Sequence, residues 1–146
     1  MKNLIFRKSR GFLSLVLFLF LFSSCGGNAR EMLIGTWEGT DFDFEQSEGP
    51  DLSAMIDGGK ELHINGQLIL EETGTYIITA AGGMMNGKGT WEIKDDMLIM
   101  LDENDNEVIN TIEDLSDDEL VTSNEVAMES PLGNIAGKIT LKYKKL

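Results

Sequence analysis

Hydrophobic and polar residues alternate with a repeat of two along most of the chain from Leu33 onward. Glycine, asparagine and aspartate separate the alternating segments, which is typical of short strands joined by tight turns. The pattern predicts strands over residues 33–44, 60–64, 67–72, 74–81, 88–94, 97–101, 107–115, 119–128 and 138–144. Strands in this meander order predict an all-β domain, either an antiparallel barrel of about eight strands or a sandwich.

The first predicted strand changes its alternation partway along. Trp37 falls on the odd positions, whereas Phe42 and Phe44 fall on the even ones. A β-bulge or bend near Gly39 would bring all three side chains to the same face.

Residues 45–59 are predicted to form a loop with one helical turn at Leu52–Ile56. Asn65-Gly66 is a strong hairpin signal, and it predicts that strand 60–64 turns back into strand 67–72. His63 would then lie on a strand, where a surface position is the simplest interpretation.

A different pattern precedes the alternating region. Lys2, Arg7, Lys8 and Arg10 come first, and the run from Phe12 to Phe22 is apolar except for one serine. This run is shorter than the ~20 residues that a membrane-spanning helix needs. Residues 1–24 are therefore predicted to be a cleaved signal peptide.

Ser23-Ser24-Cys25-Gly26 follows this run and resembles the lipobox of bacterial lipoproteins, in a form frequent in the Bacteroidetes type. The resemblance implies cleavage before Cys25, a diacylglycerol on its thiol and an acyl chain such as palmitate on its amine. An ordinary secretory signal is the alternative. It would leave Cys25, the only cysteine of the chain, without a disulfide partner.

A lipidated Cys25 would place the protein on a bilayer, with residues 25–32 as the lipidated cysteine and a short tether. The resemblance implies the bacterial outer membrane, because Gly26 is not the aspartate that retains lipoproteins in the inner membrane. Both the periplasmic face and the cell surface stay open.

The predicted mature chain is strongly acidic. The whole sequence has 12 basic and 25 acidic residues, and the signal peptide removes four basic and no acidic ones, which leaves a net charge of −17. Such a surface repels nucleic acid. The remaining 122 residues are enough for one domain, residues 33–146, with one core.

Several segments occur in a recognisable order. Leu33-Ile-Gly-Thr-Trp37 opens the first strand, and Gly89-Thr-Trp91-Glu-Ile-Lys precedes a polar turn and an aliphatic strand. Ile112-Glu-Asp-Leu-Ser-Asp-Asp-Glu-Leu120 and the basic strand Ile139–Lys145 follow. This order resembles the lipocalin-like domains of Bacteroidetes-type lipoproteins, and it implies an up-and-down β-barrel.

In lipocalins an arginine of the last strand covers the first-strand tryptophan. Here that strand has only Lys142, Lys144 and Lys145, of which one could make a cation–π contact instead. Closure of the barrel would place these lysines beside residues 32–37.

The family resemblance also implies a small hydrophobic ligand inside the barrel, although an eight-stranded barrel can equally be filled by its own side chains. The candidate ligand-lining residues are Trp37, Tyr76, Met84, Met85, Trp91 and Met97, together with Met100. Packing in the core is the alternative role for all of them.

Catalysis is not expected, because the chain has one histidine and its one cysteine is assigned to the lipid. No cofactor is expected beyond the covalent lipid. A weak calcium candidate is the stretch with Asp102, Asn104, Asn106 and Glu113, which has oxygen ligands at suitable spacing but lacks the central glycine.

Two functions remain: a membrane-anchored, non-enzymatic binding module for a small hydrophobic ligand, or an accessory cell-envelope protein with a filled barrel. The second would act on a protein partner through its acidic surface.

Overall fold

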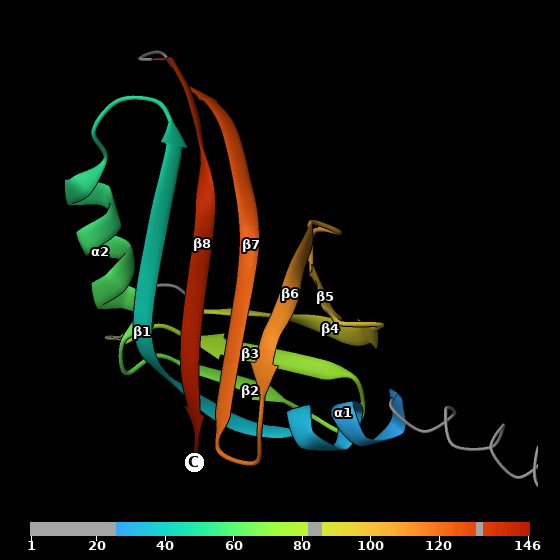
Figure 1. Ribbon diagram of the computed structural model, residues 1–146. Helices are drawn as coiled ribbons and strands as arrows, with labels where there is room; N and C mark the ends of the chain where they lie inside the picture. The colour runs from blue at the N-terminus through green and yellow to red at the C-terminus, as the bar shows by residue number, and fades with distance from the viewer. Residues whose placement is uncertain (1–25, 82–85, 131–132) are drawn as a thin grey trace, which may run out of the picture.

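A computed structural model of the chain describes residues 26–81, 86–130 and 133–146. The predicted signal peptide, Cys25, Met84 and Met85 lie outside the described residues. The described residues form two helices and eight strands (Figure 1). The helices are α1 (Gly26–Leu33) and α2 (Ser53–His63). The strands are β1 (Gly35–Glu48), β2 (Gln67–Leu70), β3 (Thr75–Thr79), β4 (Gly87–Lys94), β5 (Met97–Asp102), β6 (Glu107–Leu115), β7 (Glu119–Ser130) and β8 (Gly133–Lys145).

The eight strands form one closed antiparallel barrel. Each strand pairs with the next in sequence, and β8 pairs with β1 to close the sheet. In this closing pair Trp37 lies opposite Lys145, and Phe44 lies opposite Ile139. The predicted all-β fold is thus confirmed as a barrel. Lys145 lies beside Trp37 as expected, whereas Lys144 and Lys142 lie farther along β1 than expected, opposite Glu38 and Asp41. The long strands β1, β7 and β8 extend beyond the other strands at the top of Figure 1.

The bulge that the alternation of β1 required is present. The register between β1 and β8 shifts between Gly39 and Asp41. Trp37, before the shift, is wholly buried. Phe42, after the shift, lies opposite Leu141, and both residues line an internal pocket. The extra residue therefore keeps the hydrophobic side chains of both halves of β1 inside the barrel.

The prediction of a strand at residues 60–64 is wrong, because α2 continues to His63. The sequence up to His63 also fits a helix. Ile56, Gly59 and His63 are three and four residues apart, a spacing that places them on the same face of a helix. Asn65 does adopt the left-handed conformation expected of a turn, with φ of 63°. Here, however, this residue follows a helix, a position where asparagine is also favoured. The expected turn at residues 52–56 is the beginning of this longer helix.

Residues 26–33, expected as part of a short tether, form α1, which lies across one end of the barrel (Figure 1). Leu33 is wholly buried in the core. Arg30 donates a hydrogen bond to the carbonyl of Glu72 in the turn between β2 and β3, at 3.2 Å. Lys145 donates to the carbonyl of Met32 at 2.6 Å. Helix α1 is therefore docked on the barrel by both packing and hydrogen bonds.

The two Gly-Thr-Trp segments have matching surroundings. Trp37 donates its indole N–H to the carbonyl of Leu33 at 2.8 Å, and the Lys145 amine lies 4.9 Å from its ring centre. Trp91 donates to the carbonyl of Glu71 at 3.0 Å, and the Arg30 guanidinium lies 4.5 Å from its ring centre. The lysine contact expected over Trp37 is confirmed, and a second cation covers the other tryptophan.

The core is continuous and lies inside the barrel, beside α1. Its buried members come from α1 and from six of the strands, and are Leu33, Trp37, Leu68, Leu70, Tyr76, Trp91, Leu98, Met100 and Leu120. Since the sheet closes on itself around this core, residues 26–146 contain every element needed to bury it.

Candidate functional site

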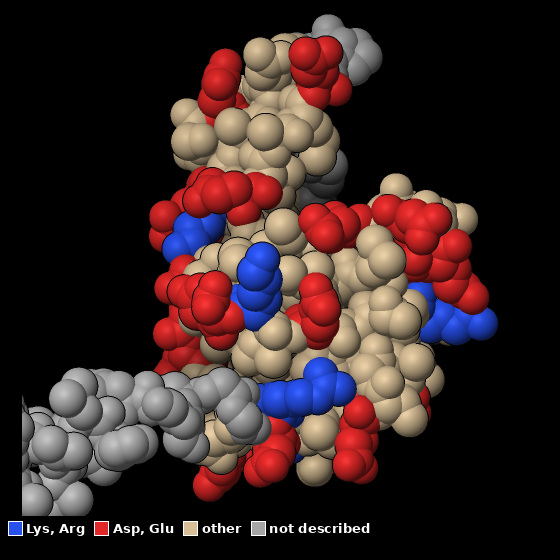
Figure 2. Space-filling view, turned by 90° about the vertical axis from the view of Figure 1, so that its right-hand side faces the viewer, with Lys and Arg blue, Asp and Glu red and all other residues tan. Residues whose placement is uncertain are grey.

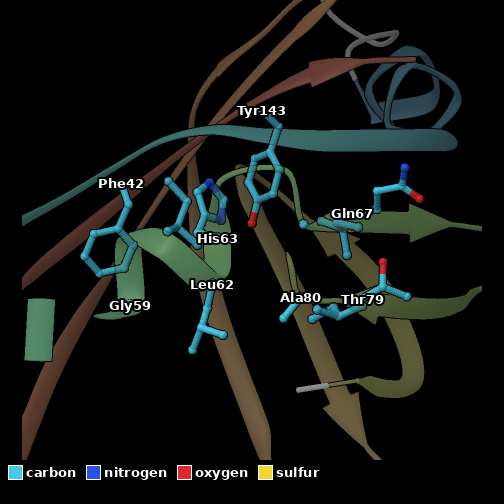
Figure 3. Close-up of a pocket in the computed structure, with 12 residues that line it drawn as sticks. Phe42, Gly59, Leu62, His63, Gln67, Thr79, Ala80 and Tyr143 are labelled. Carbon is cyan, nitrogen blue, oxygen red and sulfur yellow. The ribbon is translucent and has the colours of Figure 1, made fainter. Parts of the chain in front are cut away.

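A pocket of about 280 Å³ lies between α2 and the inner face of the barrel (Figure 3). It lies toward the end of the barrel away from α1. Strand β2 runs from Gln67, which lines the pocket, to Leu70, which pairs with Gly35, two residues after the end of α1. The pocket is therefore a space that the core side chains leave open, and α2 forms one of its walls.

Most of the wall is hydrophobic, with side chains from five elements: Phe42, Leu62, Leu68, Ile78 and Leu141. Ile78 faces the inside of the barrel opposite Leu68, yet 36% of its surface is exposed. An inward-facing isoleucine with this exposure shows that solvent enters the pocket. Hydrophobic walls that water can reach are typical of sites for small apolar molecules, and the volume is near the lower limit for such sites.

His63 is fixed in the wall by three contacts. Its Nε2 lies 3.0 Å from the carbonyl oxygen of Lys142, so Nε2 carries the ring proton and donates. Its ring meets the edge of Tyr143 at 4.8 Å between centres and lies 6.4 Å from Phe42. Burial lowers the pKa of His63, although hydrogen bonds to the backbone of Lys142 and Asp41 act in the opposite direction. The imidazole is therefore neutral at pH 7 and half-buried rather than a surface histidine.

Tyr143 provides the polar group that points into the pocket. Its hydroxyl is directed into the space between His63, Leu62 and Ala80 (Figure 3). Among the described residues the hydroxyl has no hydrogen-bond partner. Burial raises the pKa of Tyr143, so this group stays a neutral hydroxyl that can both donate and accept.

The nearby charges are paired outside the pocket. Asp41, at the bulge, lies 3.5 Å from the amine of Lys142 and 3.7 Å from that of Lys60. These three side chains are half-exposed and do not line the pocket. The pocket is therefore uncharged although the surface around it carries ions.

The predicted ligand-lining residues that the structure describes lie outside this pocket. Trp37, Tyr76, Trp91 and Met100 belong to the buried core. Met97 begins β5, opposite Lys94 and Thr111, and is half-buried. None of these five residues lines the pocket beneath α2.

The calcium candidate is divided between two places. The carboxylate of Asp102 accepts hydrogen bonds from the backbone N–H groups of Asn104 and Asn106, at 2.7 and 2.9 Å. Asp102 ends β5, and Asn104 and Asn106 lie in the turn that leads to β6. Glu113 lies six residues beyond Glu107 on β6, about 20 Å along a strand, and it binds Ser123 and Lys138. In the described part of the chain no cluster of acidic or histidine side chains is placed to hold a metal.

Sequence reasoning missed the wall that α2 provides, with Leu62 and His63, because this segment was predicted to be a strand. The alternation of Ile139, Leu141 and Tyr143 was recognised, and it places Leu141 and Tyr143 on the inner face of β8. This alternation along β8 was the sequence feature from which part of the pocket lining could have been predicted.

Neither α1 nor α2 is long and apolar enough to cross a membrane, and this finding covers only the described residues. No protein-family model matches the chain, and no curated protein sequence matches it. The pocket and the fold are therefore the basis on which a function can be argued.

Proposed function

We propose that this chain is a membrane-anchored, lipocalin-like lipoprotein whose barrel is a non-enzymatic binding module for a small hydrophobic ligand. The observation that carries the proposal is the solvent-open, hydrophobic pocket beneath α2. Its walls come from elements far apart in the sequence, so the pocket exists only in the folded barrel. Phe42, Leu62 and Leu141 supply the apolar contact, and Tyr143 supplies a polar group that orients the ligand.

The proposed anchor is the lipidated Cys25, on the outer membrane of a bacterium. Helix α1 begins at Gly26, the residue after Cys25. At 1.5 Å per residue an eight-residue helix spans about 12 Å, so the lipid would be attached close to the end of the barrel that α1 covers. The pocket lies toward the other end.

A second candidate is an accessory role without a ligand, in which the acidic surface binds a cell-envelope protein. Two observations favour it. The core beside α1 is filled by Trp37, Trp91 and their neighbours. Acidic side chains are spread over the face in Figure 2, with few basic ones among them. The pocket distinguishes the two candidates, because only the binding module needs it to be occupied.

The anchor is tested by growing the host with an alkyne analogue of palmitate and separating membranes from soluble protein. We expect the natural chain to be labelled and membrane-bound, and Cys25→Ala to be unlabelled and released. A Cys25→Ala protein that stays labelled at the membrane would contradict the lipid anchor.

Ligand binding is tested by native mass spectrometry of the protein purified from its own host. We expect a bound small molecule that is lost from Ala80→Phe, which fills the pocket. Ala127→Phe is the matched control, because Ala127 is exposed on β7 and does not line the pocket. A protein with no adduct, and no uptake of a hydrophobic fluorescent probe, would favour the accessory role.

A further inference from the structure

The pocket differs from its surroundings in charge. Of the twelve described residues that line it, none is aspartate, glutamate, lysine or arginine. The polar residues among them are Tyr143, His63, Gln67 and Thr79, and their side chains are all uncharged at pH 7. A charged ligand group placed here would lose its hydration without gaining a counter-ion, which is strongly unfavourable.

The ions around the pocket lie outside it. The two lysines nearest in the sequence to lining residues, Lys60 and Lys142, share the carboxylate of Asp41, are half-exposed and do not line the pocket. His63 is no substitute, because its one proton is donated to the carbonyl of Lys142. The overall negative charge of the domain also opposes the approach of an anion. An anionic head group is therefore disfavoured both inside the pocket and on the way to it.

The hydroxyl of Tyr143 is the polar group left for a ligand. It faces the pocket and, among the described residues, makes no hydrogen bond. Gln67 and Thr79 pair across β2 and β3, next to the pair Leu68 and Ile78. Because successive side chains of a strand face opposite sides of the sheet, the side chains of Gln67 and Thr79 face away from the side on which Leu68 and Ile78 line the pocket. A single neutral oxygen or nitrogen group on the ligand would satisfy Tyr143, while the rest of the ligand contacts Leu68, Ile78 and Leu141.

We infer that the ligand is a small, uncharged amphipathic molecule, such as an alcohol, ester or amide, whose polar group hydrogen-bonds to Tyr143. This inference rests on the proposed binding function and defines its ligand class. The volume of about 280 Å³ admits on the order of ten non-hydrogen atoms, at about 30 Å³ for each water-sized group. A long acyl chain would extend out of the pocket.

The test compares three probes of equal chain length, which are 1-octanol, octanoate and octylammonium. Residues 26–146 are titrated at pH 7 and physiological salt, and binding is followed by the methyl NMR signals of Leu62, Leu68, Ile78 and Leu141. We expect octanol to shift these signals and to bind at least tenfold more tightly than either charged probe. No shift with any probe would overturn the proposed binding function together with this inference. Equal or tighter binding of octanoate or octylammonium would overturn only the inference.

Two tyrosine variants test the assignment of the polar contact. Tyr143→Phe should weaken octanol binding by about 2- to 10-fold, as expected for one lost hydrogen bond. Tyr76→Phe is the matched control and should leave binding unchanged, because Tyr76 is a core residue that does not line this pocket. Thermal unfolding checks that both variants are folded. Unchanged octanol affinity in folded Tyr143→Phe would contradict the role of its hydroxyl.

Discussion

His63 is the one histidine of the chain, and the fold holds it in its neutral form. Burial lowers its pKa, and its N–H is donated to the backbone of Lys142. The ionisable groups that face it are Asp41 and Tyr143. Asp41 is paired with two lysines, and burial raises the pKa of Tyr143, so neither changes its charge near neutral pH.

The free energy of unfolding should fall as the pH is lowered below about 6.5, the ordinary pKa of histidine. In that range His63 binds a proton in the unfolded chain but not in the folded chain, because folding lowers its pKa. The slope is at most about 1.4 kcal/mol per pH unit and ends where the folded protein is protonated as well. Urea unfolding between about pH 5 and pH 7 measures it.

His63→Gln is the control, since it removes the titrating group and keeps a side-chain donor. The variant should lose most of this slope. If the variant shows the same pH dependence of unfolding free energy as the natural chain, carboxylates rather than His63 cause that dependence in this range.

At the scale of elements, the local sequence pattern predicts the secondary structure correctly where residues close together in the sequence determine it. The alternation of β1 predicted both its strand and its bulge, because the side chains of Trp37 and Phe42 must reach the same interior. Helix α2 was not predicted because residues 60–64 fit both the two-residue repeat of a strand and the repeat of a helix. The contacts that favour the helix come from residues far away in the sequence. Phe42 and Tyr143, on β1 and β8, pack against His63. The pocket depends on the same long-range packing, so its site could not be predicted from local pattern.

The bulge of β1 is also where this strand meets the end of α2. Gly39 makes two backbone hydrogen bonds with the turn that follows α2: its N–H donates to the carbonyl of Gly66, and its carbonyl accepts from the N–H of Asn65. A β-carbon on residue 39 would overlap the carbonyl oxygen of His63 and lie 2.9 Å from its ring. Glycine is therefore required at position 39, because the backbone of β1 lies too close to His63 to leave room for a side chain.

Gly39→Ala should destabilise the protein by about 1–3 kcal/mol, the usual cost of forcing extra atoms into a packed site. The displaced α2 should also weaken octanol binding. Gly87→Ala is the matched control, because a β-carbon there meets nothing within 4 Å, and its effect should stay within about 0.5 kcal/mol. Chemical denaturation of both variants measures the difference. Equal stability of the two would show that α2 does not pack tightly on the bulge.

At the scale of the whole molecule, β8 is the strand that completes the sheet. It pairs with β7 along twelve residue pairs and with β1 from Trp37 to Glu48. It also carries Leu141 and Tyr143 into the pocket and Lys145 over Trp37. Without it, β1 and β7 would both become open edges, which are prone to aggregate.

Deletion of residues 138–146 should abolish cooperative unfolding and produce an aggregating chain. Leu146→Ser is the control, since Leu146 is 63% exposed, and it should change stability by no more than about 0.5 kcal/mol. Circular dichroism during heating and size-exclusion chromatography compare the two. A soluble, cooperatively unfolding deletion variant would show that seven strands can close without β8.

The same pairing has a consequence for the timing of folding. Trp37 and Lys145 are opposite each other although more than 100 residues separate them in sequence. Hairpins between successive strands can form as the chain emerges, but β1 has its partner only after β8 has been made. Such long-range closure is slow. If the chain is exported, as we propose, it would cross the membrane before the barrel, and with it the pocket, could form.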